Sequence, residues 1–321
     1  MFIGRKSPDQ GHSLSSSSIP KKDEEQIRVG GQAVIEGVMM RSTNSMAIAV
    51  RKPNGEIVVK REGLTFFSEK TFFFKLPLIR GVIALISALT LGIRALNYSA
   101  NQALSEVEGE KDLSPWAMSL TFALAICFGI FLFFLIPLYL TKWLRFAVPM
   151  LSTSGLLFNL VDGVIRLMIF LVYLWAISFF KEIQRVFQYH GAEHKSIFAF
   201  EAGEELMTER VKGFSYLHPR CGTSFLLIVM VVSILVFALI PHHLSFGYKV
   251  ASRLVFIPFI AGLSYEIIRF ADRRRLNRGV QYFIKPGLWL QRLTAREPSE
   301  AQIEVAIRAL QEVLKLEGRI R

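Results

Sequence analysis

The feature that most constrains this chain is a run of uncharged residues between Asp112 and Lys142. A helix crosses the hydrocarbon core of a bilayer with roughly 20 apolar residues, and this run is longer. Composition agrees, because 52% of the residues are hydrophobic and only 20% are charged. These fractions exclude disordered chains, collagens and disulfide scaffolds. We therefore predict a transmembrane helix over 116–140.

Three further stretches are apolar enough to be transmembrane helices: 163–180, 223–240 and 250–270. The first requires Arg166 to extend its long side chain toward the membrane surface. The last carries Arg253 near one end and Glu266 near the other, where an ionisable group suggests function. The fold class that follows is mainly α, a polytopic membrane protein with about four spans in a transmembrane domain over 113–270.

Residues 76–105 are also apolar, but polar side chains recur along one helical stripe: Arg80, Ser87, Thr90, Arg94, Asn97 and Asn101. A stripe of this kind favours an interfacial or packing helix over a fifth span. We therefore expect this segment to lie against the membrane domain without crossing the bilayer.

The distribution of basic residues predicts the orientation. Residues 1–75 and 269–321 hold twelve Lys and Arg each, whereas the connections 141–155 and 241–253 hold two each. Cytoplasmic segments carry the excess of basic residues. We therefore expect a multi-pass protein of the inner (plasma) membrane, with both termini and the loop 181–221 in the cytoplasm.

The predicted cytoplasmic parts are a disordered leader over 1–26, a small β unit over 27–75 and a tail over 271–321. In the β unit we expect strands at 33–38, 46–51 and 56–61, the last two joined by a Lys-Pro-Asn-Gly turn. In the tail, an interfacial helix around Pro286 precedes an amphipathic helix that a capping box of Ser299 and Gln302 opens.

The tail begins with a basic run, Arg273–Arg275 and Arg278, which favours anionic lipid headgroups as partners. No nucleic-acid recognition module surrounds the run, and the Gly30-Gly31 pair lacks the rest of a phosphate loop. We therefore expect a lipid bilayer and no nucleic acid as partner, and a homo-oligomer is compatible with the sequence.

The strongest chemical signal is Tyr-His-Gly-Ala-Glu-His-Lys at 189–195. On a helix, His190 and His194 project from one face, where two imidazoles can chelate one divalent metal. Glu193 lies beside them as a candidate base for a metal-bound water, in the spacing of the inverted zinc-peptidase motif. The alternative is a set of polar interface residues.

A second cluster, His218 and Cys221, lies at the entrance of the next predicted span, on the same side of the membrane. Imidazole and thiolate are the ligands that zinc prefers. The alternative is a polar loop beside a buried thiol.

Two carboxylates are further candidates. Glu266 lies 72 residues after His194, a separation at which inverted zinc peptidases supply a third ligand, but it can equally pair with Arg269. Glu36 is a carboxylate between glycines at the end of a predicted strand, where it can act as ligand, acid or base, or pair with Arg41.

Together these segments resemble the YqhQ-like family of bacterial membrane proteins, which are catalogued as predicted metal-dependent enzymes. The stretches that carry the resemblance are 30–41, 189–195, 218–225 and 290–309, the last with a Thr-Ala-Arg-Glu-Pro core in which Ala295 replaces an expected second Thr. The resemblance implies metal-site motifs at His190, Glu193, His194, His218 and Cys221, with Glu36 in the N-terminal signature. It implies no substrate.

Three hypotheses follow. The first is a hydrolase-like metal-dependent enzyme in which three ligands, with zinc as the expected metal, leave a position for water that Glu193 deprotonates. The second is a scaffold or assembly factor whose metal is closed by four ligands and only structural. The third is a transporter that uses Glu266 or Asp162 as a proton or ion site.

Overall fold

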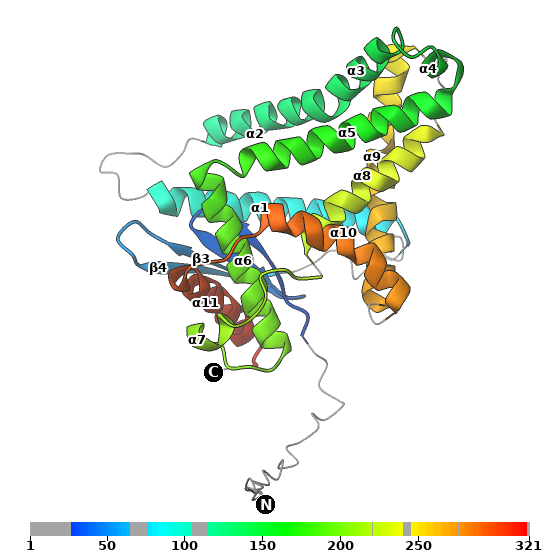
Figure 1. The fold of residues 1–321 in the computed structure, drawn as a ribbon. Helices are drawn as coiled ribbons and strands as arrows, with labels where there is room; N and C mark the ends of the chain where they lie inside the picture. The colour runs from blue at the N-terminus through cyan, green and yellow to red at the C-terminus, as the bar shows by residue number, and fades with distance from the viewer. Residues whose placement is uncertain are drawn as a thin grey trace, which may run out of the picture.

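The computed structural model describes residues 27–64, 76–104, 115–219, 221–239, 245–274 and 277–319. An antiparallel sheet flanked by helices lies beside a group of long apolar helices (Figure 1). This arrangement confirms a mainly helical chain with a small N-terminal strand unit. The predicted leader over 1–26 falls outside the described residues.

The sheet has four strands, each antiparallel to the next: β1 Gly30–Val34, β2 Gly37–Arg41, β3 Ser45–Arg51 and β4 Ile57–Gly63. The two later strands and their turn match the predicted positions, and Gly55 in that turn has a φ of +89°, which glycine adopts without strain. The single strand predicted over 33–38 is instead the turn between β1 and β2, where Glu36 has a φ of +51°. Because apolar residues lie on both sides of Glu36, the hydrophobic pattern of the sequence does not indicate this turn.

Both faces of the sheet are covered, because successive side chains of a strand point to opposite faces. On one face, Ala47 and Ala49 share a core with α6 (Lys181–Glu201) and α11 (Glu300–Leu316). On the other face, Met46 and Ile48 pack with residues of α1 (Ile79–Leu104). The sheet is thus a middle layer between α1 and the α6–α11 pair (Figure 1).

The capping box predicted for the last helix is confirmed. The Ser299 side chain accepts the Gln302 backbone N–H, and the Gln302 side chain accepts the Ser299 backbone N–H. The apolar positions of α11 are buried in the core that it shares with the sheet. Capping and amphipathic spacing therefore placed this helix correctly.

The remaining helices include the long apolar ones, and their bounds are α2 Pro115–Ile130, η3 Phe131–Leu135, α3 Ile136–Leu144, α4 Met150–Thr153, α5 Gly155–Ile177, α7 Thr208–Val211, α8 Gly222–Ala238, α9 Phe246–Arg273 and α10 Arg278–Thr294. The short η3 is a π-helical turn between α2 and α3.

Within the described ranges, four helices are long and apolar enough to cross a membrane, judged by length and composition: 79–103, 119–144, 155–177 and 250–273. Three of them correspond to predicted spans. The fourth is α1, which the sequence places at the membrane surface, whereas the predicted span over 223–240 corresponds to the shorter apolar helix α8.

A buried ion cluster joins α5 to α9. The Asp162 carboxylate lies 2.9 Å from Arg166 Nη2 and 2.8 Å from Arg253 Nη2, and all three side chains are at most 3% exposed. Asp162 therefore has two guanidinium partners, one on its own helix and one on α9.

Candidate metal centre

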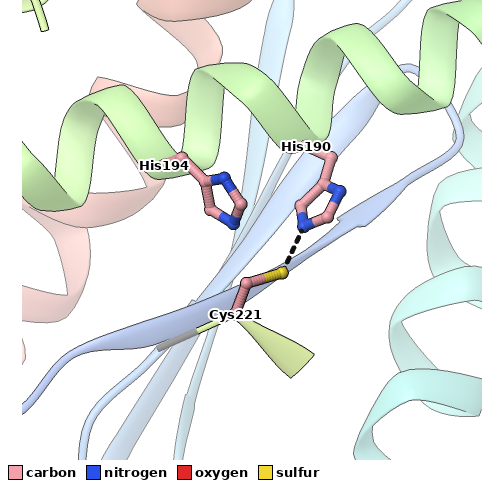
Figure 2. A group of neighbouring side chains, drawn as sticks. All are labelled: His190, His194 and Cys221. Atoms are coloured by element: carbon pink, nitrogen blue, oxygen red, sulfur yellow. Dashed lines mark hydrogen bonds between the residues drawn. The ribbon is translucent and has the colours of Figure 1, made fainter. Parts of the chain in front are cut away.

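Three residues that the sequence singled out converge on one point. His190 and His194 project from the same face of α6, and their ring centroids are 4.4 Å apart. Cys221, directly before α8, points at them from the opposite side (Figure 2). One ligand atom from each of the three residues lies within 4.8 Å of the other two.

In both imidazoles, Nδ1 is hydrogen-bonded to a backbone carbonyl oxygen. Nδ1 of His190 lies 2.7 Å from the Thr294 carbonyl oxygen, and Nδ1 of His194 lies 2.6 Å from that of Tyr216. A carbonyl oxygen only accepts, so in both neutral rings Nδ1 carries the proton and Nε2 carries the lone pair. This is the arrangement that orients histidines as metal ligands.

The Cys221 thiol lies at the N-terminus of α8. Its Sγ accepts the backbone N–H of Thr223 at 3.4 Å and lies 3.2 Å from the Thr223 hydroxyl. The positive end of the α8 helix dipole therefore points toward Sγ. Sγ also lies 3.1 Å from Nε2 of His190, the contact drawn in Figure 2.

Glu193 is buried beside this group rather than within it. Its carboxylate accepts the backbone N–H of Gly31 in β1. A Cβ at Gly31 would lie 2.8 Å from Cγ of Glu193, so a glycine is needed for this close approach. Burial raises the pKa of Glu193, while His190 and His218 act to lower it.

Gly191 explains how the chain after α10 reaches the site. A Cβ at Gly191 would lie 2.0 Å from the Arg296 carbonyl oxygen. The Arg296 N–H donates to the Phe187 carbonyl at 2.9 Å, and buried Lys195 pairs with Glu297 at 2.5 Å. The Thr-Ala-Arg-Glu-Pro segment therefore lies directly along α6, which brings the Thr294 carbonyl to His190.

His218 supports the group from outside. Its ring is buried, and Nε2 lies 3.7 Å from a Glu201 carboxylate oxygen. Its backbone N–H donates to Gln291 Oε1 at 2.9 Å, and Gln291 Nε2 donates to its carbonyl at 2.8 Å. The fully buried amide of Gln291 thus holds the loop that presents Cys221.

The two remaining candidates lie elsewhere. Glu36 accepts a hydrogen bond from Arg185 Nε at 2.6 Å and contacts the Tyr189 hydroxyl at 3.4 Å, on a different face of α6. Glu266 accepts from Arg80 Nε of α1 at 2.6 Å. Neither carboxylate belongs to the His190, His194 and Cys221 group.

Sequence reasoning missed the groups that orient the ligands. The carbonyls of Tyr216 and Thr294 carry no side-chain signal, and Gln291 is one amide within an amphipathic helix. The only indication was the Thr-Ala-Arg-Glu-Pro core, whose position next to α6 was not predictable from spacing.

The ligand atoms of His190, His194 and Cys221 lie within 4.8 Å of one another, near the spacing that a zinc ion would require. Zn–N and Zn–S bonds of about 2.0 and 2.3 Å put two ligands of one ion roughly 3–4 Å apart, a spacing that the group approaches. Nε2 of His194 is buried without a hydrogen-bond partner among the described residues. Burial also lowers the pKa of His194. An unpartnered lone pair aimed at a thiol and a second imidazole is what a bound cation would satisfy.

Comparison with known proteins places these residues in a recognised family. The model of the family described as "Protein of unknown function (DUF1385)" matches residues 76–316. The chain belongs to the DUF1385 family. It is also 34% identical over 300 residues to the "Uncharacterized protein YqhQ" of Bacillus subtilis (strain 168), which covers 90% of this chain and 93% of that protein. No solved structure matches significantly.

Proposed function

We propose that this protein is a metal-dependent, hydrolase-like membrane enzyme whose zinc ligands are His190, His194 and Cys221. The observation that carries the proposal is the pair of imidazoles, each fixed by a backbone carbonyl at Nδ1, whose Nε2 atoms both face one thiol. Hydrogen bonding of this kind is expected for ligands held in place before the metal binds.

The number of ligands favours an enzyme over a structural site. His218 lies outside the group, with its Nε2 toward Glu201. Three protein ligands would leave room for a water, and a zinc ion held by them would lower the pKa of that water and polarise a substrate carbonyl or phosphoryl group. A scaffold with a closed site would need a fourth protein ligand.

Glu193 is the residue we assign to proton transfer. It is one residue from His194 and one helical turn from His190, and the Gly31 N–H orients its carboxylate. Because burial raises its pKa, this carboxylate accepts a proton more readily than an exposed one. The role is that of a general base for water at the open position.

The decisive experiment is elemental analysis by mass spectrometry of protein purified in detergent. We expect about one zinc or iron per chain in the wild type and in Cys127→Ser, whose thiol is exposed on α2. Cys221→Ser and the double variant His190→Ala/His194→Ala should lose the metal. No stoichiometric metal in the wild type, even after divalent ions are added back, would overturn the proposal.

Two single variants separate the enzyme from the scaffold. Glu193→Gln should keep the metal and abolish hydrolysis in a screen of ester, phosphoester and amide substrates. His218→Ala should keep most of the metal. If His218→Ala empties the site as completely as Cys221→Ser does, the site has four ligands, and the scaffold replaces the enzyme.

The setting we propose is the inner membrane, with the site and both termini in the cytoplasm and the basic tail on anionic headgroups. The supporting observation is the basic charge of the two terminal regions against the two short connections. A C-terminal fusion should give a fluorescent protein that folds in the cytoplasm and an inactive alkaline phosphatase. Active phosphatase would place the tail outside.

A further inference from the structure

The packing of the sheet restricts which helices can cross a membrane. The sheet shares one hydrophobic core with α6 and α11, so all three lie on the same side of the bilayer. The sheet itself lies outside the hydrocarbon, because its edge strands β1 and β4 leave backbone groups that lipid cannot satisfy.

Two parity conditions follow from the chain order. Between the sheet and α6 the chain passes through α1, the continuous α2–α3 helix and α5. An odd number of crossings would put the sheet and α6 on opposite sides, so at most two of these three cross. Between α6 and α11 it passes through α7, α8, α9 and α10. The four-residue α7 and the amphipathic α10 are not among the apolar helices that could cross, so α8 and α9 cross together or not at all.

The contacts of α1 identify the helix that does not cross. Leu91 and Ala95 are buried against the sheet, and the Ile35 N–H donates to Ser99 Oγ at 3.2 Å. This half of α1 therefore lies outside the hydrocarbon with the sheet. Residues 79–90 remain, and twelve helical residues cover about 18 Å of a core about 30 Å thick.

The opposite face of α1 carries apolar side chains that the described residues leave uncovered. Ile79, Ile86 and Leu89 are 40%, 58% and 62% exposed, and exposed Arg94 continues the same side. An apolar face flanked by a long basic side chain suits the boundary between headgroups and acyl chains.

The start of α1 is fixed to the sheet-side part of α9. Arg80 pairs with Glu266, which lies toward the C-terminal end of α9. Gly81 faces Gly262, where a Cβ would come within 2.9 Å of the Gly262 Cα. The uncovered face of α1 therefore begins beside a helix long and apolar enough to cross the bilayer.

We propose that α1 is a membrane-surface helix whose outer face binds the bilayer surface while its inner face carries the sheet. The chain then crosses the bilayer four times, through α2–α3, α5, α8 and α9. The seventeen-residue α8 is a span, and the longer α1 is not. The sheet and α6, which carries both histidines of the metal centre, lie on the membrane side that holds α1.

Spin labels test the depth of α1 in the full chain. Single cysteines replace Ile79 or Leu89 in a Cys127→Ser background, with the buried Cys221 retained, in phosphatidylethanolamine and phosphatidylglycerol vesicles. Leu120 on α2 and Phe131 at the start of η3, 49% and 52% exposed, are the matched controls on the continuous α2–α3 helix. Power saturation with oxygen and a nickel chelate reports each depth.

We expect Ile79 and Leu89 at one shallow depth, and Phe131 deeper than Leu120 by up to about 16 Å, eleven residues along a helix. A spanning α1 would place Leu89 up to about 15 Å deeper than Ile79. Such a difference in depth between the two positions would overturn the proposal. Labels at Ile79 and Leu89 that both contact only water would overturn it as well.

Labelling with an impermeant maleimide tests the parity separately. Cysteines at Asn54 and Glu204, both exposed, should react from the same side of the membrane, and a cysteine at Phe146, 85% exposed, should react from the other. Reaction of Asn54 and Glu204 from opposite sides would refute the four-span topology. Neither measurement depends on a bound metal.

Discussion

Replacement of Gly191 by Ala tests the packing that positions the candidate metal centre. Alanine is the better helix former, so in an open helix this change stabilises by about 1 kcal/mol. Here the new Cβ would lie 2.0 Å from the Arg296 carbonyl oxygen. An ordinary contact is about 3.5 Å, so the segment after α10 must move away by roughly 1.5 Å.

The cost of that movement has two parts. Overpacking a close contact costs about 1–3 kcal/mol. The shift also weakens the bonds from Arg296 N–H to Phe187 O and from His190 Nδ1 to Thr294 O, each worth about 1 kcal/mol. After the gain in helix propensity, we expect a net destabilisation of about 2–3 kcal/mol.

Thermal unfolding in detergent measures the effect. At about 2–4 °C per kcal/mol for a protein of this size class, the melting temperature of Gly191→Ala should fall by roughly 5–10 °C, with loss of metal. Gly129→Ala on α2 is the matched control, because nothing lies within 4 Å of its Cβ position. A Gly191→Ala protein with wild-type melting temperature and metal content would refute the close approach.

Three further changes test separate contacts. Gln291→Ala frees the loop that presents Cys221 and should raise the zinc dissociation constant tenfold or more by chelator competition. Burial raises the pKa of Glu312, but Lys315 and Arg61 outweigh it and hold the value below the ordinary one. The stabilisation from this carboxylate is therefore present at neutral pH and lost as pH falls through its folded pKa. Glu312→Gln should cost about 1.5–3 kcal/mol at pH 7, with the difference shrinking below about pH 4. Asp162→Asn leaves two buried arginines without a carboxylate and should cost about 3–5 kcal/mol in a thermal melt. An unchanged melting temperature for Glu312→Gln or Asp162→Asn would contradict the ion pairs of the carboxylate that was replaced.

Local patterns predicted the elements of the fold but not their layers. Periodic apolar residues and the Ser299 cap placed α11, and the Lys-Pro-Asn-Gly turn placed the hairpin of β3 and β4. Strands covered on both faces are apolar throughout, so their pattern does not show where a turn interrupts them. This is why the sequence predicts one strand over 33–38, which contains the turn at Glu36.

The sequence singles out His190, His194 and Cys221, which the structure brings together, but it does not indicate the groups that hold them in place. The i, i+4 spacing of His190 and His194 is a property of one helix. The approach of Cys221 depends on the Gln291 amide, which is 73 residues away from His218 in the chain. Glu266 had the spacing of a third ligand, but spacing along the chain carries no information on Arg80, its actual partner on α1.

The N-terminal sheet belongs to the candidate site although the family match begins at residue 76. The Gly31 N–H binds the Glu193 carboxylate, and a side chain at Gly31 would collide with it. The sheet also covers Tyr189 and Ala192 on α6, the helix that carries both histidines. A buried carboxylate with its backbone donor removed would take up a proton or seek water, so the chemistry assigned to Glu193 requires β1 in place. Gly31, the second glycine of the pair at the start of β1, is therefore explained by its close contact with Glu193, about 160 residues later in the chain.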